Sequence, residues 1–461
     1  MSLLFMSISA IAQPLGEALK GFIHDDAVAM VHLRSFYFDR TNPMPPNNAA
    51  WAGGGWVGYQ SGWLYDTLQV GAIGYTTQPL WAPATTSGSQ ILKPGQYGFF
   101  VLGQAYASAR AGGQTFTAYR QLIDELEVNP NDDRMVPITF EAYALRGRIA
   151  TVNYFAGYVA AIKPKDYSTF INMAERAGAS DYNAGMGLVS LKYGSLDDLR
   201  LRGSVYYVPD ILTSSYGDFG KTVALSDRLK FRVESNVMAQ GSKGLDLPTS
   251  QPFSTWSAGA RVTLLLDDFT LWGAYTHTGN TAAYRAPYGQ WIGYTKQITL
   301  DFDRANERAW QIGLTYDFAG IGFRGLTFLA SATLGHGAID SITGAPLSNN
   351  NEYDFDLTYR LAATSAPDWL QPLQLRGRMG LVDQTQAGVT TTIEDFRLIL
   401  NYEMKFGARA ARRPWLRAFP RLRPANNRPR PAPRRYARQA SPASARPSRR
   451  RAPDGSPSPR P

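Results

Sequence analysis

The stretch Phe396-Arg-Leu-Ile-Leu-Asn-Tyr-Glu-Met-Lys-Phe406 alternates apolar and polar side chains with the period of a β-strand. One face is entirely apolar or aromatic and carries Phe396, Leu398, Leu400, Tyr402, Met404 and Phe406. The other face is polar, with Ile399 as its apolar exception, and carries Arg397, Asn401, Glu403 and Lys405. A long strand with two such different faces separates two different environments. The stretch therefore predicts an all-β fold.

The same alternation recurs upstream, in 310–318, 353–361 and 373–381. Turn-forming residues separate such segments, for example at Asn42-Pro43 and at Asp267-Asp268. A soluble β-sandwich would also alternate, so the pattern alone leaves that fold open. Aromatic residues at the ends of the apolar faces favour a membrane, where they form interfacial girdles. Since no apolar run reaches the roughly 18 residues of a membrane-spanning helix, a membrane protein of this sequence must be a closed barrel.

The composition agrees with a β-rich protein, because aromatic residues make up 12% of the chain and charged residues only 18%. The absence of cysteine excludes disulfides, thiolate metal sites and cysteine nucleophiles. The net charge of +10 is unevenly placed. Residues 407–461 hold 16 Arg, no Lys and one Asp, which gives +15, so the rest of the chain carries 10 − 15 = −5. The basic character thus belongs to the tail.

Three parts of the chain are expected. Residues 1–12 form a short apolar stretch ending in Ala10-Ile-Ala12, which resembles the end of a secretory signal. Residues 13–406 form the barrel, whose last strand resembles the C-terminal signal recognised by the barrel-assembly machinery. Residues 407–461 are rich in Arg and Pro, lack periodicity and are expected to be a disordered tail.

Six blocks in the region 22–406 resemble the OprD family of specific porins of Gram-negative bacteria. These blocks are Val31-His-Leu-Arg-Ser-Phe-Tyr-Phe-Asp-Arg40, Asn131-Asp-Asp-Arg-Met-Val-Pro-Ile-Thr-Phe-Glu-Ala-Tyr143, Ile162-Lys-Pro-Lys-Asp-Tyr-Ser-Thr-Phe170 with Met173-Ala-Glu, Tyr206-Tyr-Val-Pro-Asp210, Pro287-Tyr-Gly-Gln-Trp-Ile-Gly-Tyr294 and Asp301-Phe-Asp-Arg-Ala-Asn-Glu-Arg-Ala-Trp310. Several blocks in the right order are more specific than any one short motif.

The resemblance implies an antiparallel outer-membrane barrel of about eighteen strands whose inward-folded loops narrow the pore to an eyelet. It also implies passive uptake of small carboxylate-bearing solutes, such as aromatic acids or amino acids, along a ladder of arginines. The expected partners are small anionic or zwitterionic solutes, outer-membrane lipid and lipopolysaccharide, and the barrel-assembly machinery. Monomers or weak homotrimers are expected.

Strand parity predicts the arginine stripe, which we define as Arg34, Arg40, Arg360, Arg376, Arg378 and Arg397. Each of these residues lies opposite an apolar strand face, and the first and last strands of a closed barrel are neighbours. An arginine facing lipid at mid-depth would cost about 2–4 kcal/mol, so the lumen is the favoured side. A guanidinium can bind both oxygens of a carboxylate. The alternative is that these arginines are solvated and paired with Asp354, Asp356 and Glu403.

For the eyelet, the resemblance indicates Arg134, and charge and position add the other candidates, Asp133, Asp301, Asp303, Arg304, Tyr288 and Tyr294. Opposite charges on two sides of a constriction would orient a zwitterion. The alternative is an external turn, because Asp and Asn are common in turns.

Signals for catalysis are poor. The four histidines, His24, His32, His277 and His336, have no metal-ligand spacing, and no nucleophile motif is present. Gly53-Gly-Gly55 is expected to be a flexible turn. We therefore predict no catalytic residue, metal or cofactor, and keep a barrel-borne enzyme or adhesin as the alternative function.

Overall fold

The computed structural model of the chain describes residues 15–247 and 251–407. The signal-like segment 1–12 and the tail from residue 408 onward lie outside the described residues. A short helix α1 (Leu15–Lys20) and one π-helical turn (Gly21–Asp25) precede the first strand. The strands are β1 (Val28–Thr41), β2 (Asn48–Gln60), β3 (Leu68–Trp81), β4 (Phe99–Ala111), β5 (Gln114–Gln121), β6 (Thr139–Ile149), β7 (Val152–Lys163), β8 (Ile171–Asn172), β9 (Met186–Gly194), β10 (Leu199–Val208), β11 (Leu212–Ala224), β12 (Leu229–Ser242), β13 (Ser254–Leu266), β14 (Phe269–Thr278), β15 (Arg308–Asp317), β16 (Leu326–His336), β17 (Asn349–Arg360), β18 (Leu373–Gln386) and β19 (Val389–Phe406). A second helix, α2 (Met173–Ala177), follows β8, and short 3-10 turns occupy Ala84–Thr86, Phe318–Ile321 and Leu361–Ala363.

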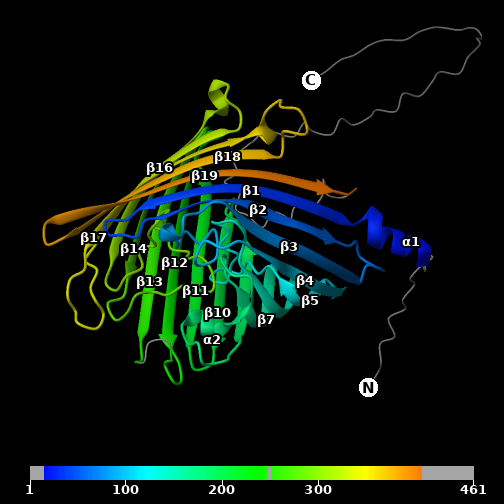
Figure 1. Cartoon of the computed structure of the whole chain (residues 1–461), viewed down its shortest axis with the longest axis horizontal. Helices are drawn as coiled ribbons and strands as arrows, with labels where there is room; N and C mark the ends of the chain where they lie inside the picture. The colour runs from blue at the N-terminus through cyan, green and yellow to red at the C-terminus, as the bar shows by residue number, and fades with distance from the viewer. Residues whose placement is uncertain (1–14, 248–250, 408–461) are drawn as a thin grey trace, which may run out of the picture. The chain divides into compact units, whose positions relative to one another are not determined.

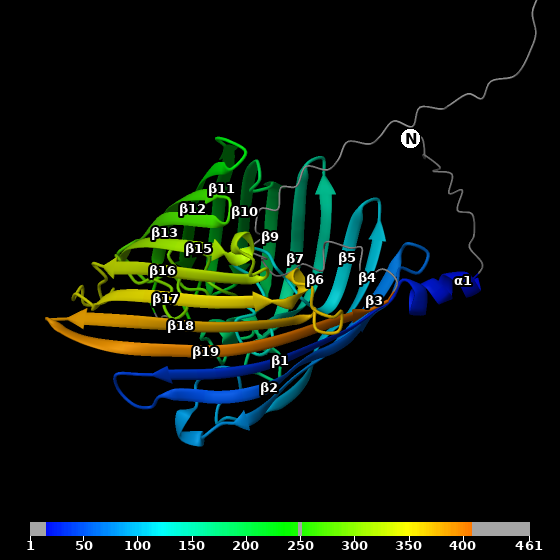
Figure 2. The ribbon, with the colours of Figure 1, turned by 90° about the horizontal axis from the view of Figure 1, so that it is seen from above.

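These strands form one antiparallel sheet that closes on itself. β1 pairs with β2 on one side and with β19 on the other, with Val31 opposite Met404. Figure 1 shows the last strand beside the first, and Figure 2 shows the strands following one another in chain order. Among the described residues the sheet has 19 strands, of which β8 has two residues, so 19 − 1 = 18 long strands form the wall. The predicted all-β barrel is confirmed.

The two faces of the wall differ in chemistry as a membrane barrel requires. Large apolar side chains point outward and are exposed, for example Ile312 at 69% and Leu398 at 50%. Polar side chains on the inward face are buried, among them Glu352 and Asp354 of β17. A soluble sandwich would bury its apolar face instead. No helix in residues 15–247 or 251–407 is long and apolar enough to cross a membrane.

The connections at the two ends of the barrel differ in length. The end that holds α1 and Phe406 has several tight turns, such as 112–113, 150–151 and 267–268. The opposite end, which we call the loop end, has the long connections 82–98, 122–138, 164–185 and 279–307. Side chains of these long loops are buried against the inward faces of the strands, for example Ile91 and Val136 beside Phe36 and Tyr75. The loops therefore fold into the barrel, as predicted.

The glycine run Gly53–Gly55 is not a turn, which corrects the sequence prediction. It lies inside β2 and pairs with β1 and β3. A Cβ on Gly54 would meet the Thr76 carbonyl oxygen at 2.2 Å, and Gly55 has a φ of +123°. Close approach between neighbouring strand backbones therefore explains these glycines better than flexibility does.

Candidate functional site

The arginine stripe lies on four strands, β17, β18, β19 and β1, which are neighbours in the closed sheet. All six arginines point inward, because each shares the parity of buried residues on its strand. The cross-strand register makes them contiguous: Arg378 is opposite Arg397, and Arg40 is opposite Asp395. Arg40 lies toward the loop end, and Arg360, the last residue of β17, lies toward the other end. The stripe therefore runs along the wall between the two ends.

Two arginines of β18 share one carboxylate on β17. The Nε of Arg376 and the Nε of Arg378 each donate to Asp356 Oδ2 at 2.9 Å. The Arg376 side chain is 35% exposed and that of Arg378 is 18% exposed, so both are accessible from the lumen. Two cations and one carboxylate leave a net charge of +1 at this point. Asp356 is thus a partner of the stripe, as the alternative interpretation predicted, but it balances only half of the local positive charge.

The same arrangement occurs at Asp395 of β19. Arg397 Nε donates to Asp395 Oδ1 at 2.7 Å, and Arg40 Nη2 donates to Oδ2 at 2.6 Å. Arg40 is 22% exposed, whereas Arg397 is only 1% exposed. A solute in the lumen can therefore contact Arg40 directly, while Arg397 acts from beneath the surface.

A third shared carboxylate joins two of the inward loops. Asp133 accepts from Arg134 Nη1 at 2.8 Å and from Lys165 Nζ at 2.6 Å. Burial alone would raise the pKa of Asp133, but Arg134 and Lys165 hold that pKa well below its usual range. Burial, together with the nearby Arg134 and Lys296, lowers the pKa of Lys165. We call these three groups the shared rungs: Asp356 with Arg376 and Arg378, Asp395 with Arg40 and Arg397, and Asp133 with Arg134 and Lys165.

Phe38 of β1 lies among the guanidinium groups of the rungs. Its ring centroid is 5.4 Å from the Cζ of Arg40, 5.4 Å from that of Arg134 and 5.2 Å from that of Arg397. Stacking on an aromatic face is a favourable way to hold a cation that has little water around it. The inward position of this apolar side chain was not expected for a polar lumen face, and the three cation–π contacts account for it.

Arg34 has a different environment from the shared rungs. Its guanidinium binds Asp132 in a bidentate pair, with distances of 2.7 and 3.0 Å. It also donates to the backbone oxygen of Met135 at 3.4 Å, so it ties loop 122–138 to β1. One cation and one carboxylate balance here. Glu403, another suggested partner of the stripe, pairs instead with Lys405.

The remaining eyelet candidates lie in loop 279–307. Asp301 pairs with Lys296, and Arg304 pairs with Glu307 at 2.5 Å. Burial, together with the neighbouring Asp301 and Glu307, raises the pKa of Asp303 to about 8. The loop thus carries a cluster of charges in which the pKa of one carboxyl group is raised far above its ordinary value.

The two tyrosine candidates of the same loop differ in position. Tyr288 is 1% exposed and donates to the backbone oxygen of Met173 at 2.9 Å, so it packs the loop against α2 and does not face the lumen. Burial, together with Glu234 of β12 and Asp218 of β11, raises the pKa of the Tyr294 hydroxyl, whose oxygen is buried. Sequence analysis missed Lys165 and Lys296, although Lys165 stands in one of the blocks quoted above.

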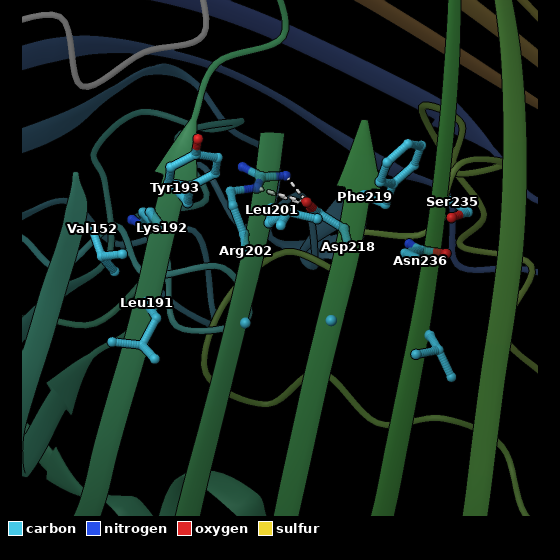
Figure 3. A pocket seen from close by; sticks show the side chains of 13 residues that line it. Val152, Leu191, Lys192, Tyr193, Leu201, Arg202, Asp218, Phe219, Ser235 and Asn236 are labelled. Carbon is cyan, nitrogen blue, oxygen red and sulfur yellow. Dashed lines mark hydrogen bonds and ion pairs between the residues drawn. The ribbon is translucent and has the colours of Figure 1, made fainter. Parts of the chain in front are cut away.

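A second charged group lies on the inward face of β9–β12, and we define the opposite wall as this group: Arg200, Arg202 and Lys192 with the carboxylates Asp218, Glu234 and Glu125, whose charges balance. Arg202 Nε donates to Asp218 Oδ2 at 2.9 Å, and the two side chains point toward one another in Figure 3. Arg200 lies 3.2 Å from Asp218 and 3.2 Å from Glu234. A further ion pair joins Lys192 to Glu125 at 2.6 Å. Three cations therefore meet three carboxylates.

An open pocket lies over Gly203 and Gly217 of the same strands. Its rim includes Leu191, Leu201 and Val237, which are exposed on the outward face (Figure 3). The inward-facing residues Lys192, Arg202 and Asp218 also line it. The pocket thus lies beside the balanced ion pairs of the opposite wall and away from the shared rungs.

Comparisons with known proteins place this geometry in context. The family model described as outer membrane porin, OprD family, matches residues 20–406. The crystal structure of Pseudomonas aeruginosa OpdK with vanillate aligns with a TM-score of 0.72 at 19% identity, over 84% of this chain and 100% of that one. Acinetobacter baumannii OccAB3 gives a TM-score of 0.74 at 19% identity, over 83% and 100% of the two chains. A BenF-like porin from Pseudomonas fluorescens Pf-5 gives 0.72 at 18% identity, over 83% and 99%. No curated protein sequence matches the chain.

Proposed function

Since the chain belongs to the OprD family of outer membrane porins, we propose that it conducts small carboxylate-bearing solutes passively along the arginine stripe. The family and the fold are those of channels rather than enzymes. One observation carries the proposal: in each shared rung two cations share one carboxylate, so the partly exposed cations Arg376, Arg378 and Arg40 keep hydrogen-bonding capacity for a solute. An incoming carboxylate can share these donors with the resident one.

The shared rungs also explain how a solute could leave again. Conduction requires sites that attract the solute but release it readily. At each rung the resident carboxylate competes with the solute for the same guanidinium donors, which weakens binding of the solute. Arg376, Arg378 and Arg40 are the partly exposed cations that would meet it. Successive weak sites of this kind favour stepwise movement over trapping.

The direction of the path follows from the connections. In outer-membrane barrels the long loops are extracellular and the short turns are periplasmic. The loop end would thus face the outside, and a solute would meet the Asp133 rung in loops 122–138 and 164–185 early on its way. Asp395 and then Asp356 follow along the wall toward Arg360. The charged cluster of Lys296, Asp301, Asp303 and Arg304 would form part of the constriction.

The solute class we favour is small monocarboxylic acids, either aromatic acids or amino acids. OpdK was crystallised with vanillate, which is a property of that protein. In this chain the carboxylate would bind the rungs, and the balanced opposite wall would meet the rest of the molecule. Lipid, lipopolysaccharide and the barrel-assembly machinery are the proposed partners, with Phe406 at the end of β19 as the expected assembly signal. We propose monomers or weak homotrimers.

Liposome swelling tests the proposal directly. Proteoliposomes are compared with protein-free liposomes in a benzoate-like acid, in arginine and in a neutral sugar of similar size. We expect faster swelling for at least one carboxylate than for the sugar, and an anion-favouring reversal potential in planar bilayers. Folded protein that conducts nothing, or that conducts the sugar as fast as every acid, contradicts the proposal.

A further inference from the structure

Two buried carboxylates on β17 have no cation partner within ion-pair distance in the described part of the chain. Glu352 is fully buried and Asp354 is 3% exposed, and their side chains point inward two residues apart on one strand. Buried carboxylates need compensating donors, because removing a charge from water is costly. The donors found here are backbone N–H groups of loop 279–307.

Three consecutive N–H groups of that loop donate to the two carboxylates. Ile298 N donates to Asp354 Oδ2 at 2.7 Å. Thr299 N donates to Glu352 Oε1 at 2.6 Å, and Leu300 N donates to Glu352 Oε2 at 2.8 Å. Hydrogen bonds to charged groups are stronger than neutral ones. We call Ile298, Thr299 and Leu300 the docked segment, since their backbone is held on the wall by side chains of β17.

The docked segment covers the middle shared rung. The backbone oxygen of Ile298 accepts from Arg397 Nη2 at 3.0 Å, and the Thr299 hydroxyl lies 3.5 Å from Asp395 Oδ2. This contact explains why Arg397 is only 1% exposed although it points into the lumen. The docked segment is therefore bound by two strands. Carboxylates of β17 accept from its N–H groups, and Arg397 of β19 donates to one of its carbonyl groups.

A glycine on β18 makes room for this arrangement. Gly380 is the register partner of Asp354. A Cβ at position 380 would lie 3.1 Å from Asp354 Oδ1, 3.3 Å from Thr299 Oγ1 and 3.4 Å from Glu352 Oε1. Position 380 thus touches both carboxylates and the docked segment. Any larger side chain there would push on the contact without changing a charge.

We propose that Glu352 and Asp354 are positioning residues that hold the docked segment over the Arg397 rung and thereby set the width and anion preference of the pore. The inference rests on the proposed function, because it assigns to that same lumen the residues that shape it. Each hydrogen bond to a charged acceptor is strong enough to change a docking equilibrium by about ten-fold or more. Loss of three such bonds releases the segment, widens the pore and uncovers Arg397.

Two variants separate positioning from charge. Glu352→Gln/Asp354→Asn replaces both carboxyl groups by amides and weakens the hydrogen bonds to the docked segment, whereas Gly380→Val displaces the segment and leaves both carboxyl groups in place. Gly377→Val is the matched control on the same strand, since Gly377 faces outward and its Cβ would make an ordinary 3.6 Å contact with Leu398. Each variant is prepared as the full chain, and its β content is checked by circular dichroism before use.

Single-channel conductance and amide hydrogen exchange are the two measurements. We expect both the double variant and Gly380→Val to show higher conductance, noisier open channels and faster exchange at Thr299 and Leu300, with Gly377→Val behaving as the wild type. Wild-type conductance and exchange in both folded variants overturn the inference. So does a double variant that shifts only the reversal potential while Gly380→Val changes nothing, because the carboxylates would then act through charge alone.

Failure of this inference is distinguishable from failure of the proposed function. If the wild type itself does not conduct, the proposed function is wrong, and hydrogen exchange still decides whether the segment is held by the carboxylates. If the wild type conducts carboxylates and the variants match it in both measurements, only the positioning role is wrong.

Discussion

The two walls of the lumen contain similar residues and differ in how their charges are matched. The shared rungs set six cations against three carboxylates, and the two further carboxylates of that wall, Glu352 and Asp354, are bound by backbone N–H groups. The opposite wall sets Arg200, Arg202 and Lys192 against three carboxylates. Both walls place two arginines two residues apart on one strand. The difference teaches that the number of arginines does not by itself make an anion path, because carboxylates within reach can cancel them.

The largest change in carboxylate flux is expected when the charge of one shared rung is reversed. Arg376→Ala/Arg378→Ala leaves Asp356 alone and changes the rung from +1 to −1. The solute also loses donors whose hydrogen bonds to a carboxylate contribute about 1.5–3 kcal/mol. Since Arg376 is partly solvated, we take about 2 kcal/mol and expect carboxylate flux to fall by about thirty-fold. Swelling rates of proteoliposomes measure the change.

The control for that experiment is Arg200→Ala/Arg202→Ala on the opposite wall, which removes an arginine pair of the same spacing. We expect a clearly smaller loss of carboxylate flux from this variant. Equal losses from the two pairs would mean that the lumen responds only to its total charge, and the distinction between the walls would not hold.

The opposite change removes the carboxylate and keeps the cations. Asp356→Asn frees Arg376 and Arg378 from their resident partner and raises the rung from +1 to +2. Hydrogen bonds to charged groups contribute about 1.5–3 kcal/mol, so the apparent dissociation constant of a carboxylate should fall by about ten-fold. Flux should then saturate at lower solute concentration. Asp218→Asn on the opposite wall is the matched variant, and tightening of similar size there would argue against a special role for the shared rungs.

The sequence predicted which side chains point into the lumen better than it predicted which charged side chains pair with one another. Parity along a strand is a local property, so the inward position of Arg376 and Arg378 followed from the apolar residues of the other parity, such as Leu375 and Met379. The register between strands is not local. Arg200-Leu-Arg202 has the same spacing and was overlooked, although its pattern is equally visible. Whether such a pair shares one carboxylate or meets two depends on which residues lie across the strand.

Contacts made by the inward loops were still harder to predict. Asp133 was a candidate from sequence, but its second partner, Lys165, comes from a different loop. Glu352 and Asp354 look like ordinary lumen residues in the sequence. Their partners are backbone N–H groups of a distant loop, and every residue except proline has such a group, so the sequence does not identify them. Gly53–Gly55 was expected to be a turn, since glycine favours turns, and only strand packing shows why it lies inside β2. Tertiary contacts thus decided what local patterns could not.

A smaller effect should come from pH, through Asp303. Burial, with Asp301 and Glu307 nearby, raises the pKa of this carboxyl group to about 8. Below that pH the group is protonated and neutral, and above it the group adds one negative charge to the constriction. We therefore expect anion preference to decline as pH rises through about 8. Reversal potentials recorded on both sides of that pH measure the decline, and Asp303→Asn should remove it. A decline that persists unchanged in Asp303→Asn would assign it to another group.

The smallest effect on carboxylate flux is expected from a substitution that keeps the charge of a rung and changes only its hydrogen-bonding geometry. Arg40→Lys keeps two cations on Asp395 but loses the paired Nε and Nη2 donors, at 2.9 and 2.6 Å. Lysine is a point charge and cannot reproduce that fork. If the count of charges decides anion preference, the reversal potential should stay close to that of the wild type, with carboxylate flux changed by less than about two-fold, as expected for a partly solvated pair. Arg202→Lys provides the same exchange on the opposite wall. A large loss from Arg40→Lys alone would show that the two-donor geometry of the guanidinium, rather than the excess of cations, distinguishes the two walls.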